Sequence, residues 1–319
     1  MIGLIDVITI GDAMITFDPS VSGPLRFVDS FKKKVGGAEL NIAIGCARLG
    51  LQTTFLSRIG DDEFGRFIYN FLRGEGIDVS EVKLVKDHPT SLNFKELREG
   101  GFSETYYYRY KSPTLTLTPS SLNEDVFRKS RLLHISGVFP SINSRNIGII
   151  DAAIQLAKKH KLKISLDPNI RLKLWSEKKA KDTLLRWLPE VDYLLAGIDE
   201  AELLFGTQDV DQIIYNAKRY AISHLFIKLG EKGAKLWTNE QLYTCDSIHT
   251  TKVVDVVGAG DGFGAGAIYG LLHDWEPEKV LKFANTIGAM VVEVYGDNEG
   301  LPYLDEAISR FENRKKIDR

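Results

Sequence analysis

Short runs rich in isoleucine, valine and leucine recur along the chain and are separated by segments of helical period. The runs predict strands buried on both faces, at 7–10, 54–59, 132–135, 164–166, 193–195 and 225–229. Apolar residues spaced by three and four predict amphipathic helices at 40–49, 63–74, 147–159, 201–205, 212–220, 265–272 and 277–294. This alternation predicts an α/β fold with a mostly parallel sheet, whose ligands would bind at the carboxyl ends of the strands.

Two stretches, 17–35 and 91–110, lack the helical period and alternate polar with apolar residues. They carry turn residues such as Asp18-Pro19 and Gly100-Gly101, which is typical of antiparallel strands. We therefore expect residues 1–319 to form a single α/β domain into which segments of about 13–35 and 89–113 insert a small β-sheet. Such a sheet could act as a lid.

Composition narrows the function classes. The 319 residues are 44% hydrophobic and carry a formal net charge of −2, which gives no electrostatic reason to expect nucleic acid or an anionic membrane as partner. Two distant cysteines, Cys46 and Cys245, form neither a disulfide framework nor a metal motif. The N-terminal residues do not resemble a signal peptide, and no apolar stretch approaches a membrane span, so we expect a soluble cytoplasmic protein.

The segment 253–266 has the most informative pattern, an apolar run expected to be a strand, then a glycine-rich turn, then a helix. Free amides at a helix N-terminus attract phosphate, although such a turn can also be only a tight turn. The spacing Gly260-x-Gly262-x-x-Ala265 formally fits a dinucleotide fingerprint as well. Against that alternative, little chain follows the turn, and Asp261 would place a carboxylate where pyrophosphate should lie.

A carboxylate beside an anion-binding turn suits a different chemistry. Asp261 could accept a proton from a hydroxyl that attacks phosphorus, while the amides of Gly258, Ala259 and Gly260 hold the charge of the transferring group. This arrangement is typical of a small-molecule kinase, because phosphoryl transfer needs mainly positioning and charge neutralisation.

Two motifs resemble those of a known family, the ribokinase-like (phosphofructokinase-B type) sugar kinases. They are Gly258-Ala259-Gly260-Asp261 following Asp255, and Gly36-Gly37-Ala38-Glu39-Leu40-Asn41. The resemblance continues in order through segments 60–65, 74–77, 228–233 and 283–285. It implies a ribokinase-like three-layer core, a β-sheet lid through which subunits pair as homo-oligomers, and ATP and Mg²⁺ as cofactors. Whether a monovalent cation is also needed stays open.

The resemblance also implies roles for individual residues. Asp261 matches the catalytic base and Gly258, Ala259 and Gly260 the anion hole, and the predicted nucleotide-binding residues are Asn169, Lys228, Gly230, Gly233, Gly258, Gly260 and Asn285. Gly36, Gly37 and Asn41 match the sugar-binding motif. Glu200 matches the acid of an Asn-x-x-Glu motif linked to metal, but Gly197 replaces its asparagine, and Glu200 could simply be an acid in the first turn of a helix.

Two arginines bear on the choice of sugar. In a strand at 105–110 a period of two places Thr105, Tyr107 and Arg109 on one face and the remaining tyrosines on the other. Arg171 follows a buried strand at the edge that faces ligands. Two arginines in one pocket suit a carboxylate better than a neutral sugar. The alternatives are a tyrosine-rich dimer surface for the strand and a loop-closing salt bridge for Arg171.

Within the family, Tyr107-Tyr108-Arg109 and Asp167-x-Asn169-x-Arg171 resemble the 2-keto-3-deoxygluconate kinases. That resemblance implies Tyr107, Arg109 and Arg171 as ligands of an acid sugar, with Asp297 near the acceptor. Asn93 stands where a tyrosine is usual, and Lys111 also departs from the pattern. We therefore expect ATP-dependent formation of 2-keto-3-deoxy-6-phosphogluconate. The alternatives are a kinase for fructose or another neutral sugar, a non-catalytic sugar sensor, and a nicotinamide-dependent dehydrogenase.

Overall fold

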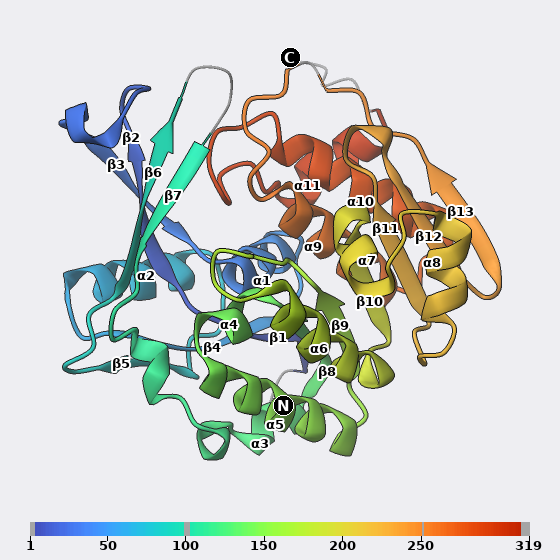
Figure 1. Ribbon diagram of the computed structural model, residues 1–319, viewed down its shortest axis with the longest axis horizontal. Coiled ribbons are helices and arrows are strands. Elements are labelled where there is room, and N and C mark those ends of the chain that lie inside the picture. Colours follow the sequence, from blue (N-terminus) through green and yellow to red (C-terminus); the bar gives the residue numbers. More distant parts are fainter. Residues whose placement is uncertain (1–3, 99–102, 251, 314–319) are drawn as a thin grey trace.

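The computed structural model describes residues 4–98, 103–250 and 252–313, so the turn predicted at Gly100-Gly101 lies outside the described residues. Nine strands form the main sheet, in the order β13-β12-β11-β10-β9-β8-β1-β4-β5 (Figure 1). Their bounds are β1 Ile5–Ile10, β4 Thr53–Gly60, β5 Val82–Val85, β8 Ser130–Ser136, β9 Lys163–Asp167, β10 Tyr193–Gly197, β11 His224–Lys228, β12 Ala234–Thr238 and β13 Gln241–Cys245. All neighbours from β11 to β5 pair in parallel, and β12 and β13 add an antiparallel edge.

Helices cover both faces of the main sheet. The helices are α1 Ala38–Arg48, α2 Glu63–Gly74, α3 Glu124–Arg128, α4 Val138–Ile142, α5 Ser144–Lys159, α6 Glu177–Trp187, α7 Ile198–Phe205, α8 Val210–Ala217, α9 Ala259–Leu272, α10 Pro277–Val291 and α11 Leu304–Phe311. Residues of α3 to α8 pack in one apolar cluster, and those of α1, α2, α9, α10 and α11 in clusters on the other face. Successive residues of a strand point to opposite faces of the sheet. Leu194 of β10 therefore packs in the cluster with α3 to α8, and Leu195 packs in a cluster on the other face.

A separate four-stranded sheet, called here the small sheet, has the order β3-β2-β6-β7. Its strands are β2 Met14–Pro19, β3 Phe31–Gly36, β6 Ser91–Leu97 and β7 Ser103–Tyr108. Each predicted segment forms one antiparallel hairpin, and the two hairpins join through the parallel pair β2 and β6. In Figure 1 the small sheet, blue and teal at the upper left, projects away from the main sheet. The predicted fold class, an α/β core with a small additional sheet, is confirmed.

The apolar run before the glycine-rich turn is not a strand, which corrects the sequence-based prediction. Residues 252–256 form neither a strand nor a helix. The amides of Val254 and Asp255 both donate to the carbonyl of Val292, at 2.7 and 3.3 Å, so the segment is fastened to the end of α10 instead of a neighbouring strand. The side chains of Val253, Val254 and Val256 are exposed, so apolar character here does not mark a buried strand.

Among the described residues, no helix combines the length and apolar character needed to cross a membrane.

Two glycines give matched tests of the packing. A Cβ at Gly137, directly after β8, would lie 1.9 Å from the carbonyl oxygen of Pro168, whereas a Cβ at Gly148 in α5 would have nothing within 4 Å. We expect Gly137→Ala to lower the free energy of unfolding by about 2 kcal/mol or more, because the backbone at Gly137 or at Pro168 must move to make room for the methyl group. Gly148→Ala should raise it by about 0.5–1 kcal/mol, since alanine loses less entropy in a helix. Urea unfolding measures both, and equal stabilities of the two variants would contradict this packing.

Candidate active site

Two cavities meet at the carboxyl ends of the central strands. The first, called the α10 cavity, has a volume of about 600 Å³ and includes Gly233, Val253, Phe263, Asn285 and Ala289 in its wall. The second, called the central cavity, measures about 830 Å³ and includes Asn41, Asn93, Arg109, Arg171 and Asp261. Lys228, Gly230, Val256 and Gly260 line both cavities. A molecule bound in one cavity can therefore reach a molecule bound in the other.

Asp261 lies in the first turn of α9 and is buried. The side-chain amide of Asn41 donates to its Oδ2 at 2.8 Å, and that of Asn169 points to its Oδ1 at 3.4 Å. Burial raises the pKa of Asp261 to about 7; the Asn41 hydrogen bond lowers it, Asp167 raises it, and Arg171 and Lys228 lower it. Asp261 is therefore a carboxyl that can both take up and release a proton near neutral pH.

Gly258 allows the chain to enter α9 beside this carboxyl. Its φ is +80°, a left-handed conformation, and a Cβ there would lie 2.1 Å from the carbonyl oxygen of Asp297. Only glycine satisfies both conditions without strain. The first amides of a helix have no acceptor within it, so the amides of Ala259 and Gly260 are placed as donors for an anion.

Lys228 provides a fixed positive charge at the junction of the cavities. It is the last residue of β11, and its Nζ pairs with Asp167, the last residue of β9, at 2.7 Å. Burial alone would lower the pKa of Lys228, but Asp167 and Glu200 together raise it, so the ammonium stays charged. A Cβ at Gly260 would lie only 3.6 Å from this Nζ, which places the ammonium beside the N-terminus of α9.

Glu200 lies in the first turn of α7 and accepts hydrogen bonds from two backbone amides. Its Oε2 accepts from the amide of Gly197 at 2.7 Å and its Oε1 from the amide of Ile170 at 3.0 Å. Glu200 thus closes a capping interaction at its own helix and holds the loop after β9, while still lining the central cavity. Within the described part of the chain, no three acidic, histidine or cysteine side chains come together as a metal cluster.

The small sheet contributes the outer wall of the central cavity. Asn93 of β6 pairs in register with Tyr107 of β7, and both side chains line the cavity with Arg109. The neighbouring pair, Phe94 and Tyr106, lies on the opposite face, as the predicted alternation requires. The Arg109 guanidinium stacks over the Tyr107 ring at 4.5 Å. The Oδ1 of Asn93 is buried and has no hydrogen-bond partner among the described residues.

Arg109 is a nearly buried cation with spare donors. Its side chain is only 10% exposed, and Asp12 lies 3.8 Å from its Nε. Within the described chain, Nε and Nη1 have no hydrogen-bond partner. Burial raises the pKa of Asp12, which Arg109 lowers in turn. A buried guanidinium with two free donors is costly unless a ligand supplies acceptors.

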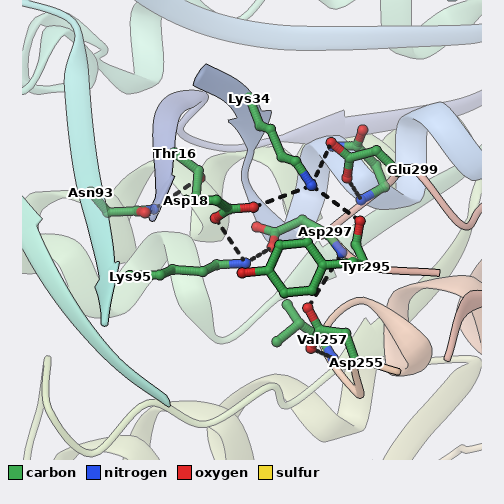
Figure 2. Close-up of polar contacts among 12 residues, drawn as sticks. Thr16, Asp18, Lys34, Asn93, Lys95, Asp255, Val257, Tyr295, Asp297 and Glu299 are labelled. Atoms are coloured by element: carbon green, nitrogen blue, oxygen red, sulfur yellow. Dashed lines mark hydrogen bonds and ion pairs between the residues drawn. The ribbon is translucent and has the colours of Figure 1, made fainter. Parts of the chain in front are cut away.

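Asp297 also lines the central cavity, where five charged residues join the small sheet to the loop 295–299 (Figure 2). Lys95 of β6 pairs with Asp297 and lies 3.7 Å from Asp18 of β2. Lys34 of β3 pairs with Asp18 at 3.2 Å and with Glu299 at 3.3 Å. Burial raises the pKa of Asp297, and the Lys95 ammonium lowers it. The two lysines pair with three carboxylates and hold the loop against the small sheet.

The sequence of this chain matches a known family. A model of the pfkB family of carbohydrate kinases matches residues 4–304. The chain belongs to this family. The resemblance in its motifs is thereby confirmed, and among the alternatives for the glycine-rich segment the kinase is right, whereas the dinucleotide fingerprint and the dehydrogenase are wrong.

Several relatives of this pfkB kinase have named activities. A 2-dehydro-3-deoxygluconokinase of Bacillus subtilis is 34% identical over 315 residues, which are 98% of this chain and 97% of that protein. Fructokinase-2 of Solanum lycopersicum is 31% identical, with 95% of each chain covered. The crystal structure of a fructokinase from Vibrio cholerae with fructose, ADP and calcium is 27% identical. It covers 97% of this chain and 99% of that chain, with a TM-score of 0.85.

The structure brings most predicted site residues of the pfkB kinase together. Gly37, Tyr107, Arg109, Arg171, Gly258 and Asp297 line the central cavity, and Gly233, Asn285 and Ala259 line the α10 cavity. Asn169 lies in the central cavity beside Asp261, whereas the amide of Asn285 donates to the carbonyl of Cys245. Gly36 packs against Asp297, since a Cβ there would lie 2.8 Å from its carboxylate.

Sequence reasoning assigned no role to four residues that the structure adds to the site. They are Asp12, Lys95, Asp167 and Asn298. Lys95 could have been found, because it lies two residues after Asn93 and so on the same face of a strand. No sequence pattern indicated the partners of Asn298, which lie far away in the chain.

The raised pKa of Asp261 predicts a stability effect. The folded protein disfavours the ionised carboxylate, so the native state loses stability as pH rises from the ordinary value of 3.8 to about 7. We expect Asp261→Asn to be more heat-stable than wild type at pH 8, with the difference in Tm shrinking as pH falls towards 4. Calorimetry across this range checks it, with the exposed Asp29→Asn as control. A difference in Tm that does not change with pH would contradict the assignment.

Proposed function

We propose that this pfkB kinase uses ATP to phosphorylate a sugar acid, 2-keto-3-deoxygluconate, at its terminal hydroxyl. One observation carries the choice of a sugar acid over a neutral sugar. Arg109 is almost buried in the wall of the central cavity, with two donors that no described residue satisfies. A carboxylate of the substrate would accept from one of these donors and add to the compensation of the buried charge that Asp12 begins at 3.8 Å. The curated relative from Bacillus subtilis acts on this type of substrate according to its name.

The transfer follows from the position of Asp261. The terminal hydroxyl of the sugar gives its proton to the Asp261 carboxylate as its oxygen bonds to the γ-phosphorus, and the bond from that phosphorus to the β-γ bridging oxygen breaks. ADP leaves with the electron pair. The amides of Ala259 and Gly260, with the Lys228 ammonium beside them, hold the charge on the transferring group. The carboxyl's pKa of about 7 suits a base that works near neutral pH.

The α10 cavity is the proposed nucleotide site. Its wall is mostly apolar, with Val253, Phe263 and Val292 to contact a base and Asn285 as a polar group. It opens to the central cavity at Gly260 and Lys228, so phosphates would extend from it towards Asp261. The relative from Vibrio cholerae was solved with ADP, which supports the nucleotide assignment.

Mg²⁺ fits a site of this kind, because it commonly takes one or two carboxylates and completes its shell with phosphates and water. Glu200 lines the central cavity, and each of its oxygens accepts from one amide of the described residues, which leaves a lone pair on each. When bound, Mg²⁺ would neutralise charge on the phosphates. The proposed role of Glu200 is to hold this ion.

The small sheet is the proposed lid of a single kinase domain. Closing the central cavity excludes water, which limits wasteful hydrolysis of ATP. Tyr108, the last residue of β7, points away from the cavity and is 62% exposed. Tyr110 follows the end of this strand and is 84% exposed. Exposed aromatic residues of this kind are typical of protein contacts, so we propose that two copies of the chain associate here.

Fructose is the second candidate substrate. The unpaired Oδ1 of Asn93 can accept a hydrogen bond from any sugar hydroxyl, so the sugar that it contacts need not carry a carboxylate. Fructokinases are also among the relatives, at 31% identity for the tomato protein. A coupled ATP-turnover screen with keto-deoxy acids, ketohexoses, pentoses and nucleosides separates the candidates. No turnover with any of them would favour a non-catalytic sugar sensor.

Replacing the base should stop the reaction and spare binding. We expect Asp261→Asn to lower kcat by about 10³-fold or more, because the attacking hydroxyl loses its proton acceptor. ATP affinity should stay nearly unchanged, and wild-type kcat should rise with pH through about 7. Coupled turnover and isothermal titration calorimetry measure both. Retained activity would overturn the assignment of the base.

The arginines should discriminate between charged and neutral sugars. We expect Arg109→Ala and Arg171→Ala to raise KM for 2-keto-3-deoxygluconate about 10- to 100-fold, and KM for fructose far less. The exposed Arg26→Ala, in the loop between β2 and β3, serves as a matched control and should change neither. Steady-state kinetics with both sugars tests this. Equal losses for the two sugars would count against a carboxylate ligand.

A further inference from the structure

A chain of three side-chain amide contacts leads from the small sheet to Asp261. The Nδ2 of Asn298 donates to the backbone carbonyl of Val35, the residue before the end of β3, at 2.7 Å. The same Nδ2 lies 3.3 Å from the Oδ1 of Asn41. Asn41 in turn donates from its Nδ2 to the Asp261 carboxylate at 2.8 Å. Asn298 and Asn41 are both buried, so water does not compete for these bonds.

The direction of these hydrogen bonds is fixed at the contact between Asn298 and Val35. A backbone carbonyl can only accept, so Val35 requires the NH₂ end of the Asn298 amide. That NH₂ group also faces Asn41, which must therefore present its oxygen. The NH₂ group of Asn41 is then left for Asp261. If the Asn41 amide turned over, its oxygen would face the carboxylate, and two acceptors would repel each other.

We propose that Asn298 is a positioning residue for phosphoryl transfer, because it fixes the orientation in which Asn41 donates to Asp261. It touches neither substrate nor the reacting atoms and acts through Asn41 alone. The inference rests on the proposed role of Asp261 as base, and it assigns a function to a residue of the loop 295–299.

The surrounding loop is held firmly enough for this task. Arg48 of α1 donates to the carbonyl of Asn298 at 2.8 Å. On either side of Asn298, Asp297 pairs with Lys95 and Glu299 pairs with Lys34, both from the small sheet (Figure 2). Lys34 also donates to the carbonyl of Tyr295 at 3.1 Å. The small sheet and α1 therefore determine together where the Asn298 amide lies.

A donor on the carboxylate favours its ionised form, so loss of the Asn41 bond would make Asp261 harder to ionise. Asp167, Arg171 and Lys228 also act on this carboxyl, and Asn169 lies at its other oxygen. These groups remain in every variant of Asn298. A change in the titration of Asp261 in such variants therefore reports the orientation of Asn41.

The test is the pH dependence of kcat in Asn298→Ala. We expect the acidic limb of the profile to move up by about one pH unit, which is roughly a tenfold loss of kcat below pH 7. At pH 9, where the base is ionised in both proteins, kcat should return to within about threefold of wild type. A loss of kcat of equal size at every pH, with the limb unmoved, would overturn the proposal, because a purely structural role predicts it.

Three further variants keep the test decisive. Asn298→Ser can donate to only one acceptor at a time and replaces Asn298→Ala if that variant does not fold; the same upward shift is expected. Asn70→Ala removes an exposed asparagine of α2, away from the amide contacts, and serves as the matched control, so the acidic limb of its profile should stay at the wild-type pH. Asn41→Ala combined with Asn298→Ala should shift the limb no further than Asn41→Ala alone, since both act through one bond. If the shifts of the two single variants added up in the double variant, the proposed chain of amide contacts would be wrong.

A measurement without substrate separates this inference from the proposed function. Carboxyl ¹³C NMR can follow the titration of Asp261 directly, its resonance identified by its loss in Asp261→Asn. We expect a higher pKa for Asp261 in Asn298→Ala than in wild type, whether or not the correct sugar is known. An unchanged titration refutes the role of Asn298, whereas absence of turnover in the wild type with every sugar refutes the proposed function.

Discussion

The burial of one carboxyl group, that of Asp261, is the constraint on which the rest of the site depends. A carboxylate shut away from water is unstable unless donors and cations compensate it. Here Asn41 donates to it, Asn169 lies beside its second oxygen, and the charged Lys228 stands nearby. These groups come from α1, the loop after β9 and the end of β11. Only a fold that brings those three ends together can keep a base buried at the N-terminus of α9.

The second theme is the dependence of the base on the small sheet. The loop 295–299 connects Asp261 with the small sheet. Two ion pairs fasten this loop to strands of the sheet, Lys95 with Asp297 and Lys34 with Glu299. Asp297 faces the central cavity, and its carbonyl packs against Gly258 at the start of α9. The wall that would cover a sugar and the turn that would hold a phosphoryl group are therefore parts of one connected structure.

The elements that were predicted well are those specified by local patterns. The helix predicted at 63–74 has those bounds in the structure, because a strong apolar period follows the N-cap Asp62, whose side chain accepts from the amide of Gly65. The strand predicted in front of the glycine-rich turn fails for a complementary reason. Its valines are apolar, but they lie on a cavity wall with no strand beside them. A strand exists only with a neighbour, and a hydrophobic run cannot reveal that neighbour.

The sequence by itself determined the α/β class, the kinase family and the motif at the start of α9. In that motif Gly258 and Asp261 lie three residues apart, and local backbone geometry suffices to place them. Only the tertiary structure decided which groups face Asp261 and Arg109. Asn298 reaches Asn41 across 257 residues, and Lys95 reaches Asp297 across 202. Such contacts arise from how whole layers pack, and because many packings are compatible with one local pattern, no short-range signal in the chain encodes them.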